Sequence, residues 1–379
     1  MRLVHMSDTH LGYFEYARID PETGLNQREQ DFYRAWRKVI DDVLADPPDL
    51  VLHAGDLFHT PRPTNRAIRV AFEAIKQVAD AGIPFVVISG NHSTPRIRAT
   101  GSIFETLALL PNVHVAYVGQ YRRVRIGGVA IHCVPHTFDE KEWRQAFDEV
   151  SLDPRAELNI LLTHGTWCGR KDFAMGEFGE QGIPDLEARL GALFDYIALG
   201  HYHRRVDIND HVSYCGSTER TGLDQMDAEP GYLRVDVGRE IQREYIPVPA
   251  RPMVRVEPQI AGASSAQQVL AQIEKEAANV PEGAIVDLRL LGIPRETYLR
   301  IDFRELERIF SHCLAVVKTV ELAAAGREPS TQARIGNLAE EFERFLLARD
   351  LPEEERKRLK EKGESYLGQQ LAEGVNEQW

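Results

Sequence analysis

The chain has 379 residues, of which 43% are hydrophobic and 27% are charged, and its formal net charge is -13. This length suffices for two or three domains, and the composition is that of an ordinary globular protein. No run of about eighteen apolar residues occurs, which excludes a transmembrane helix. The first residues lack the charged-then-apolar layout of a secretion signal. We therefore expect a cytoplasmic protein.

The acidic balance argues only weakly against a nucleic-acid partner, because phosphate binding depends on local basic surface. Such surface is available: Arg62, Arg66 and Arg69 form one cluster, and Arg96 and Arg98 form another. The four cysteines are far apart and form no C-x-x-C pair, which is typical of free buried thiols in a reducing compartment.

From residue 1 to about 250, short β-rich runs alternate with helical patterns. A helix is predicted over 30–44, where apolar residues recur at helical spacing, and further helices over 65–81 and 102–110. Strands are predicted at Leu3–Met6, Leu50–His53, Phe85–Ser89, Val124–Ile126, Val129–Val134, Ile160–Thr163, Tyr196–Leu199 and Val212–Cys215. This order predicts a mixed α/β sandwich.

Two composition changes divide the rest of the chain. The segment PVPARPM at 247–253 is typical of a linker. Beyond it, helices over 266–278 and 303–310 and strands over 285–291 and 314–322 predict a small α+β module. From 326 onward the chain is charged, with apolar residues spaced by three and four, and a second amphipathic helix begins near Pro352. We therefore expect three regions: 1–250, 251–325 and 326–379.

Side chains that can bind metal follow five predicted strands of the first region. In chain order they are Asp8 and His10, Asp56 and His59, Asn91 and His92, His164, and finally His201 and His203. The carboxyl ends of strands in open α/β sheets border the ligand crevice, so these side chains should meet at one edge. A lone loop histidine is usually solvated or a satisfied core residue. The ordered set of five is what predicts a metal site.

The chemistry of this set favours two ions over one. Oxygen and imidazole donors without thiolate suit Mn²⁺, Fe²⁺ or Zn²⁺ better than Ca²⁺. The candidates are too many for one open catalytic ion, whereas two ions that share a carboxylate would use them all. Such a pair supplies hydroxide near neutral pH and holds a phosphoryl group for in-line attack. The expected reaction is phosphoester hydrolysis.

The ordered motifs D-x-H, G-D-x-x-H, G-N-H, H and G-H-x-H resemble those of the calcineurin-like metallophosphoesterase superfamily. The form GDLFH at 55–59 is similar to its DNA-repair nuclease branch, the bacterial SbcD and meiotic-recombination-11 nucleases. The resemblance implies a β-sandwich flanked by helices over 1–250 and a DNA-capping domain over 251–325. Helices over 326–379 would bind an SMC-like coiled-coil ABC ATPase of SbcC type.

The same resemblance implies an activity and a ligand set. The protein would be a nucleoid-associated, Mn²⁺-dependent exonuclease and single-strand endonuclease of a double-strand-break repair complex. One ion would be held by Asp8, His10, Asp56 and His203, and Asp56 would bridge to a second ion held by Asn91, His164 and His201. His92 would act on the substrate with support from His59. The protein-phosphatase branch has an aspartate at the position of His59. The histidine in this chain therefore favours a nuclease over a phosphatase.

One position departs from the family pattern, and each of three other features has two interpretations. Ser93 stands where the family usually has an acid after Gly-Asn-His, which leaves rate and metal preference open. Helices 65–81 and 102–110 would form a homodimer, or their apolar stripes face only their own core. The arginines Arg62, Arg66, Arg96 and Arg98 would contact DNA phosphates, or they are simply solvated. The helices of the tail would bind the ATPase, or they pack on the core.

Two alternative functions also remain. A metallophosphatase or cyclic-nucleotide phosphodiesterase of the same superfamily would leave the second and third regions unexplained. A DNA-end tethering scaffold would have weak catalysis because of Ser93.

Gly90 is expected to let the chain turn sharply at the end of its strand.

Overall fold

A computed structural model of the protein describes residues 1–177, 179–186, 194–238, 240–260, 263, 265–323, 353, 358, 359 and 362. The chain divides into two compact units, Met1–Leu322 and Ala323–Trp379. The first unit contains the predicted sandwich and the predicted α+β module. The helices expected in the tail lie almost entirely outside the described residues. None of the described helices has the length and apolar content that a membrane span requires.

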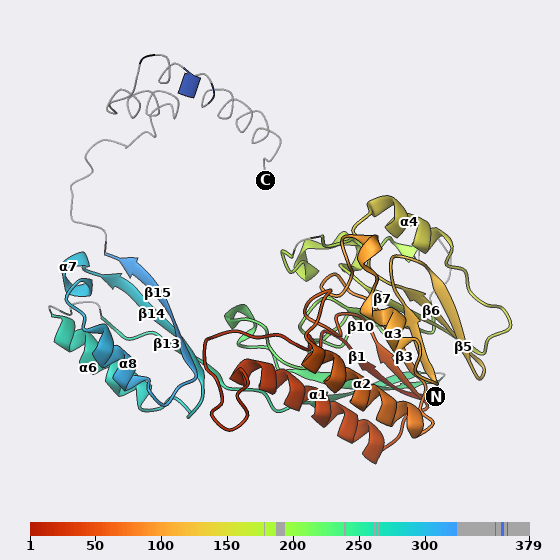
Figure 1. Ribbon diagram of the computed structural model, residues 1–379, viewed down its shortest axis with the longest axis horizontal. Helices are drawn as coiled ribbons and strands as arrows, with labels where there is room; N and C mark the ends of the chain where they lie inside the picture. Colours follow the sequence, from red (N-terminus) through yellow and green to blue (C-terminus); the bar gives the residue numbers. More distant parts are fainter. Residues whose placement is uncertain are drawn as a thin grey trace. The chain divides into compact units, whose positions relative to one another are not determined.

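Two six-stranded sheets form the centre of the first unit (Figure 1). The first has the order β12-β11-β1-β2-β3-β4 and contains β1 (Arg2–Met6), β2 (Leu50–His53), β3 (Phe85–Ile88), β4 (Val113–Ala116), β11 (Gly231–Val237) and β12 (Ile241–Pro247). The second has the order β5-β6-β7-β8-β10-β9 and contains β5 (Arg122–Ile126), β6 (Val129–Val134), β7 (Leu158–His164), β8 (Tyr196–Gly200), β9 (Val206–Asp207) and β10 (Val212–Tyr214). Strands β1 to β4 are parallel, as are β6, β7, β8 and β10. The carboxyl ends of neighbouring parallel strands therefore lie at the same edge of their sheet.

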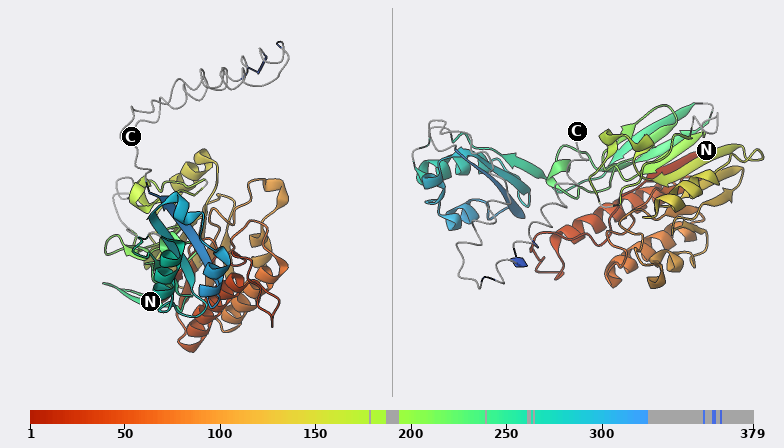
Figure 2. Two further views of the ribbon diagram at one scale, coloured as in Figure 1. Left: turned by 90° about the vertical axis from the view of Figure 1, so that its left-hand side faces the viewer. Right: turned by 90° about the horizontal axis from the view of Figure 1, so that it is seen from above.

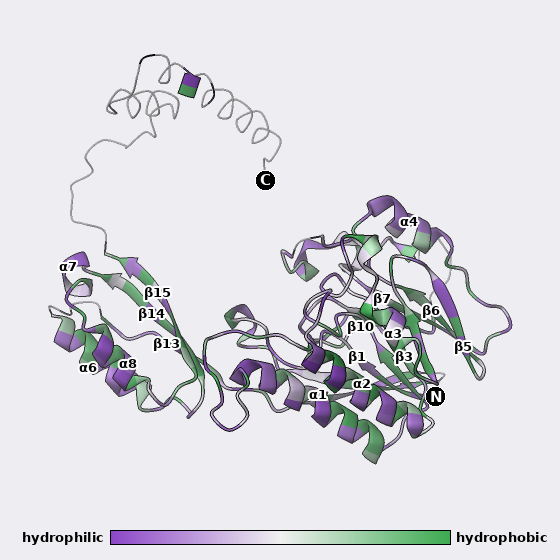
Figure 3. Ribbon diagram, in the orientation of Figure 1, coloured by the Kyte–Doolittle hydropathy of each residue, from purple (hydrophilic) through white to green (hydrophobic). Residues whose placement is uncertain are grey.

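The two sheets pack face to face, and helices cover their outer faces. Apolar side chains of both sheets, among them Leu52 and Val86 from one and Ile131 and Leu162 from the other, form the layer between them. Helices α1 (Gln27–Ala45), α2 (Asn65–Asp80) and α3 (Ile103–Leu107) pack on the first sheet, and α4 (Glu140–Asp148) on the second. Figure 2 shows α1 and α2 on one side of the sheets, and Figure 3 shows how apolar residues concentrate in the strands. This is the α/β sandwich that the sequence predicts.

Short segments complete the sandwich. The 3-10 helices are Arg98–Thr100, Trp167–Gly169, Lys171–Phe173 and Leu223–Gln225. Helix α1 begins three residues before its predicted start, because the Asn26 side-chain oxygen accepts hydrogen bonds from the N–H groups of Arg28 and Glu29. Cys168 is exposed while Cys133, Cys215 and Cys313 are buried, so the expectation of buried thiols is wrong for Cys168.

A third, three-stranded sheet follows the sandwich. Its parallel strands β13 (Met253–Val256), β14 (Ile285–Ile293) and β15 (Ala315–Leu322) are covered on one face by α6 (Ala266–Ala277) and α8 (Phe303–Ile309), with α7 (Arg295–Tyr298) after β14. Two residues before β13, Arg251 forms an ion pair with Asp31 of α1, and Met253 at the start of the strand packs with Tyr16 and Leu223. The segment 247–253, predicted to be a linker, connects β12 to β13 within the first compact unit.

The core under the first sheet allows a stability prediction. The Phe85 side chain in β3 is fully buried and contacts the rings of Trp36 and His53. Replacing it by alanine leaves a cavity, so Phe85→Ala should lower the free energy of unfolding by about 3–5 kcal/mol. Urea denaturation followed by circular dichroism measures this. Phe14→Ala is the matched control, because Phe14 is 67% exposed and should leave the midpoint unchanged. Equal midpoints for the two variants would contradict this description of the core.

Candidate metal centre

The strands bring all seven predicted metal ligands together. Asp8 and His10 follow β1, Asp56 follows β2, Asn91 follows β3, His164 ends β7, and His201 and His203 follow β8. Three of these segments come from the first sheet and two from the second, so the ligands meet where the ends of the two sheets converge. Each of the seven is at most 7% exposed. The polarity that follows each strand is therefore not that of solvated loops.

The seven side chains form two neighbouring groups of donor atoms. In one, His10 Nε2 lies 3.1 Å from His203 Nε2, which lies 3.9 Å from Asp8 Oδ1. In the other, His164 Nε2 lies 2.9 Å from Asn91 Oδ1 and 3.3 Å from Asp56 Oδ2. His201 Nδ1 lies 3.3 Å from the same Asn91 oxygen. Ligand atoms of Asp8, Asp56 and His164 lie within 4.8 Å of one another and connect the two groups.

Hydrogen bonds orient two of the histidines toward these groups. His164 Nδ1 donates to the carbonyl oxygen of Ala54 at 2.8 Å, which leaves the lone pair of Nε2 facing Asn91 and Asp56. His201 Nε2 lies 2.5 Å from Glu180 Oε1, which leaves Nδ1 facing the same site. A carbonyl or carboxylate partner of this kind fixes the tautomer of a metal-binding imidazole.

The electrostatics of the site require positive charge. Burial raises the pKa of the Asp8 carboxyl, whereas at Asp56 the effect of burial is outweighed by the His164 imidazole, which holds the pKa well below its usual range. Asp56 Oδ2 is buried and accepts no hydrogen bond of good geometry. Adjacent buried carboxylates are costly unless a cation compensates them. Divalent ions bound by oxygen and nitrogen donors fit these residues.

Strained backbone accompanies the predicted ligands. Asp8, His10, Asp56 and His201 have φ angles of +51°, +41°, +51° and +97°. Such left-handed conformations are unfavourable for non-glycine residues and persist only where the surroundings impose them. They are half of the eight positive-φ non-glycine residues in the described part of the chain. The fold therefore holds these side chains in place against a local conformational cost.

Gly90 serves a different purpose from the predicted one. Its backbone has no positive φ, so the turn after β3 does not require glycine for that reason. A Cβ atom at this position would lie 2.3 Å from Asp56 Oδ1 and 2.7 Å from the Asp56 backbone nitrogen. Glycine is needed because the loop after β3 passes this close to Asp56.

His92 lies beside the two groups, with His59 next to it. His92 Nδ1 donates to the carbonyl oxygen of His59 at 3.1 Å, and the two rings stack with centroids 5.0 Å apart. His59 thus contacts His92 through its main chain and its ring face, and not through a side-chain hydrogen bond. The His92 N–H donates to Asp56 Oδ1 at 3.0 Å, so the histidine is fixed relative to the shared carboxylate.

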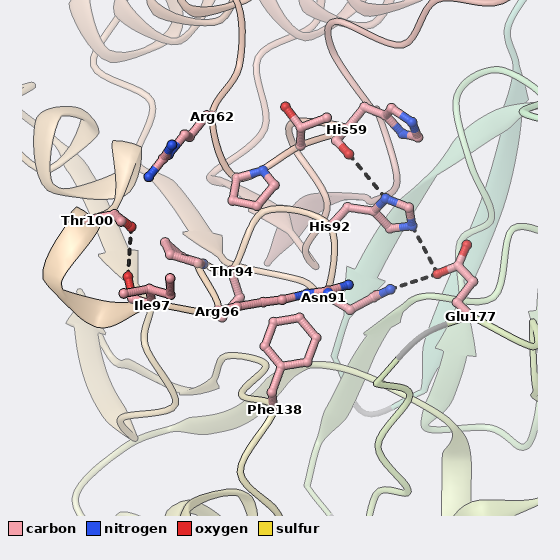
Figure 4. A pocket seen from close by; sticks show the side chains of 13 residues that line it. His59, Arg62, Asn91, His92, Thr94, Arg96, Ile97, Thr100, Phe138 and Glu177 are labelled. Atoms are coloured by element: carbon pink, nitrogen blue, oxygen red, sulfur yellow. Dashed lines mark hydrogen bonds and ion pairs between the residues drawn. The ribbon is translucent and has the colours of Figure 1, made fainter. Parts of the chain in front are cut away.

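Two glutamates of the loop between β7 and β8 also belong to the site, although no sequence motif predicts them. Glu177 Oε2 accepts a hydrogen bond from Asn91 Nδ2 at 2.7 Å and lies 3.1 Å from His92 Nε2 (Figure 4). Glu180 contacts His201. Burial alone would raise the pKa of Glu177, but its contact with His92 lowers it to about 2. The only sequence signal is the GEFGE segment at 176–180, which has no strand before it.

A cavity of about 800 Å³ opens beside His92 (Figure 4). Of the predicted DNA-binding arginines, Arg62 and Arg96 line it. Arg66 is not among the residues that line the cavity, and its Nη1 atom lies 3.7 Å from Glu29 Oε2. Arg98 begins a 3-10 helix, and its side chain lies outside what the structure describes.

The close approach at Gly90 can be tested by metal binding. In Gly90→Ala the new Cβ atom would push Asp56 out of position, so the affinity for Mn²⁺ should fall at least about tenfold. Isothermal titration calorimetry on the EDTA-treated protein measures this. Gly238→Ala is the control, because a Cβ atom at Gly238 would lie 3.7 Å from the Glu240 carbonyl oxygen, an ordinary van der Waals distance. Unchanged Mn²⁺ affinity in a folded Gly90→Ala protein would show that Asp56 does not take part in binding.

Comparison with known proteins agrees with this geometry. The family model of the calcineurin-like phosphoesterases matches residues 1–205. The DNA double-strand break repair protein Mre11 of Haloferax volcanii is 32% identical over 302 residues, which are 77% of this chain and 61% of that protein. The Mre11 proteins of Thermoplasma acidophilum and Aeropyrum pernix are 32% and 30% identical, over 67% and 69% of their own lengths. The chain spans about 60% of the first relative. It belongs to the calcineurin-like phosphoesterase family, in the branch that contains the Mre11 repair proteins.

Proposed function

We propose that this protein is a two-metal DNA nuclease of a double-strand-break repair complex, active as an exonuclease and a single-strand endonuclease. One observation carries the proposal. Two groups of buried side chains that can bind metal meet at Asp56, and His92 lies beside them at the edge of a large cavity. The Mre11 relatives are DNA double-strand break repair proteins, which supports DNA as the substrate.

Two divalent ions, Mn²⁺ by preference, would complete the site. Asp8, His10 and His203 would hold one, Asn91, His164 and His201 would hold the other, and Asp56 would bind both. When bound, such a pair supplies the nucleophile and stabilises charge on the phosphoryl group. The protein's part is to hold these donors in place, through the hydrogen bond of His164 to Ala54 and that of His201 to Glu180.

His92 is the side chain best placed to act on the substrate. Its Nδ1 is occupied by the His59 carbonyl, so Nε2, which is buried 3.1 Å from Glu177 Oε2, is the ring nitrogen left to act on the substrate. Its burial disfavours the charged form, but the neighbouring carboxylates of Glu177 and Asp56 raise its pKa to about 9. A protonated Nε2 can stabilise a phosphate oxygen or give its proton to the leaving 3′ oxygen. Arg62 and Arg96, on the cavity wall, would contact neighbouring phosphates of the strand.

The rest of the chain suggests partners. Ile68 of α2 is only partly buried, and Leu109, which follows α3, is 80% exposed, which supports a homodimer formed through this surface. Ile75, Phe104 and Leu107 instead belong to the chain's own core, and Phe72 and Ile103 pack against it. The module after Pro247 would cap the DNA. Residues 326–379, almost entirely outside the described part, would bind an SMC-like coiled-coil ABC ATPase, and the complex would act at the nucleoid.

Metal binding and catalysis should separate in single variants. Asp8→Ala removes a metal ligand and should abolish both Mn²⁺ binding at one site and cleavage of labelled single-stranded DNA. His92→Gln should leave both ions bound yet slow cleavage by about 100-fold or more, because general-acid catalysis contributes rate enhancements of this size. Calorimetry and a gel assay in Mn²⁺ and in Mg²⁺ measure the two effects. His114→Gln, on β4 away from the site, is the matched control. Wild-type cleavage rates for His92→Gln would remove His92 from the mechanism.

The leaving group provides a second test. The 3′ oxygen of DNA needs a proton as it leaves, whereas p-nitrophenolate does not. His92→Gln should therefore slow the turnover of bis(p-nitrophenyl) phosphate much less than it slows DNA cleavage. Comparing the two rates in the same Mn²⁺ buffer measures the difference. If the wild-type protein turns over the small ester but leaves DNA intact, it is a small-molecule phosphoesterase and not a nuclease.

A further inference from the structure

Ser93 carries no charge, and its side chain forms a hydrogen bond within the turn after β3. Ser93 is fully buried, and its Oγ accepts a hydrogen bond from the Gly90 N–H at 3.1 Å. Thr94 Oγ1 donates to the Gly90 carbonyl oxygen at 2.7 Å. These two contacts close the turn after β3. What an acid at position 93 would add, and serine does not, is a negative charge next to Asn91 and His92.

Glu177 places a negative charge at this location from another part of the chain. The same oxygen, Oε2, contacts both Asn91 Nδ2 and His92 Nε2, at 2.7 and 3.1 Å. The Glu177 side chain is 23% exposed and that of His92 25% exposed, so solvent has limited access to the contact. Figure 4 shows the glutamate on the opposite side of the His92 ring from the His59 carbonyl. The ring is therefore fixed at both of its nitrogens.

From this geometry we infer that Glu177 is a positioning residue for Asn91 and His92, an inference that rests on the proposed function. An amide side chain can present either its oxygen or its nitrogen to a metal site. Because the Asn91 NH₂ group donates to Glu177, the Oδ1 atom faces His164 and His201, at 2.9 and 3.3 Å. Glu177 thus selects the orientation in which Asn91 offers an oxygen ligand.

The contact with His92 has two possible consequences, and they predict opposite results. If Glu177 orients the imidazole for its work on the substrate, removing the carboxylate slows catalysis. If Glu177 instead occupies the position that a substrate phosphate takes at Nε2, removing it speeds catalysis. The simultaneous contact with Asn91 favours the first, because a group that only blocked His92 would have no reason to hold the metal-binding amide.

Three variants test the inference. Glu177→Ala removes both contacts, whereas Glu177→Gln keeps an oxygen that accepts from Asn91 but removes the charge. Asp172→Asn is the control: it removes one carboxylate from the same loop, where Asp172 is 70% exposed and paired with Arg170. Calorimetric Mn²⁺ titration and steady-state cleavage of a single-stranded oligonucleotide are measured on each full-length variant, after circular dichroism has verified folding.

The expected pattern separates the two contacts. Glu177→Ala should weaken the binding of one Mn²⁺ ion by about tenfold or more, the usual effect of losing a group that orients a ligand, and Glu177→Gln by much less. Both should lower kcat by about 10- to 100-fold with KM within about threefold of wild type. Asp172→Asn should match the wild type in all three quantities.

Two results would overturn the inference. Mn²⁺ affinity and kcat for Glu177→Ala equal to those of Asp172→Asn would show that the contacts have no role, and a higher kcat for Glu177→Gln would show that Glu177 competes with the substrate. The Mn²⁺ titration does not depend on nuclease activity. If the wild-type protein fails to cleave DNA, the proposed substrate is wrong, while the titration still decides whether Glu177 orients Asn91.

Discussion

Two carboxylates, Asp8 and Asp56, lie side by side with at most 1% of their surface exposed, and the arrangement of the rest of the site follows from this. Burying two negative charges together costs several kcal/mol unless cations or donors compensate them. Their positions come from the register of the first sheet, in which Met6 of β1 pairs with His53 of β2 shortly before each strand ends. The compensating histidines come mostly from the other sheet, so the site depends on how closely the two sheets converge.

Small residues allow this convergence. A Cβ atom at Gly55 would lie 2.2 Å from His164 Nδ1, and one at Gly200 would lie 2.0 Å from the Ala54 carbonyl oxygen. Together with Gly90, these glycines let loops from both sheets approach closely at the ends of β2, β3 and β8. The strained φ angles of four predicted ligands add about 1–3 kcal/mol each. The apolar layer between the sheets, distant from the chemistry, offsets that cost.

The sequence predicts the ligands well because each follows an apolar run that ends at the same edge of a sheet. It predicts the outer strands poorly. In β12 (Ile241–Pro247) every residue is partly or fully exposed, so the pattern lacks the apolar alternation of a half-buried strand. Strand β4, at the opposite edge of the same sheet, is likewise absent from the predicted strands. Glu177 could not be predicted either, since its contacts depend on the path of a loop that has no periodicity and lies 85 residues after His92.

The relation between Ser93 and Glu177 bears on how such motifs are interpreted. A loss of the acid after Gly-Asn-His suggests a weakened enzyme if function is assigned by position in the sequence. Electrostatic interaction depends on distance, however, and a carboxylate 3.1 Å from His92 Nε2 acts on that atom whichever loop supplies it. Serine at position 93 accepts the hydrogen bond that closes the turn, and Glu177 supplies the carboxylate, so the structural task and the electrostatic task are divided between two segments. The scaffold hypothesis rested on the missing acid at position 93, and Glu177 supplies a carboxylate at the same place.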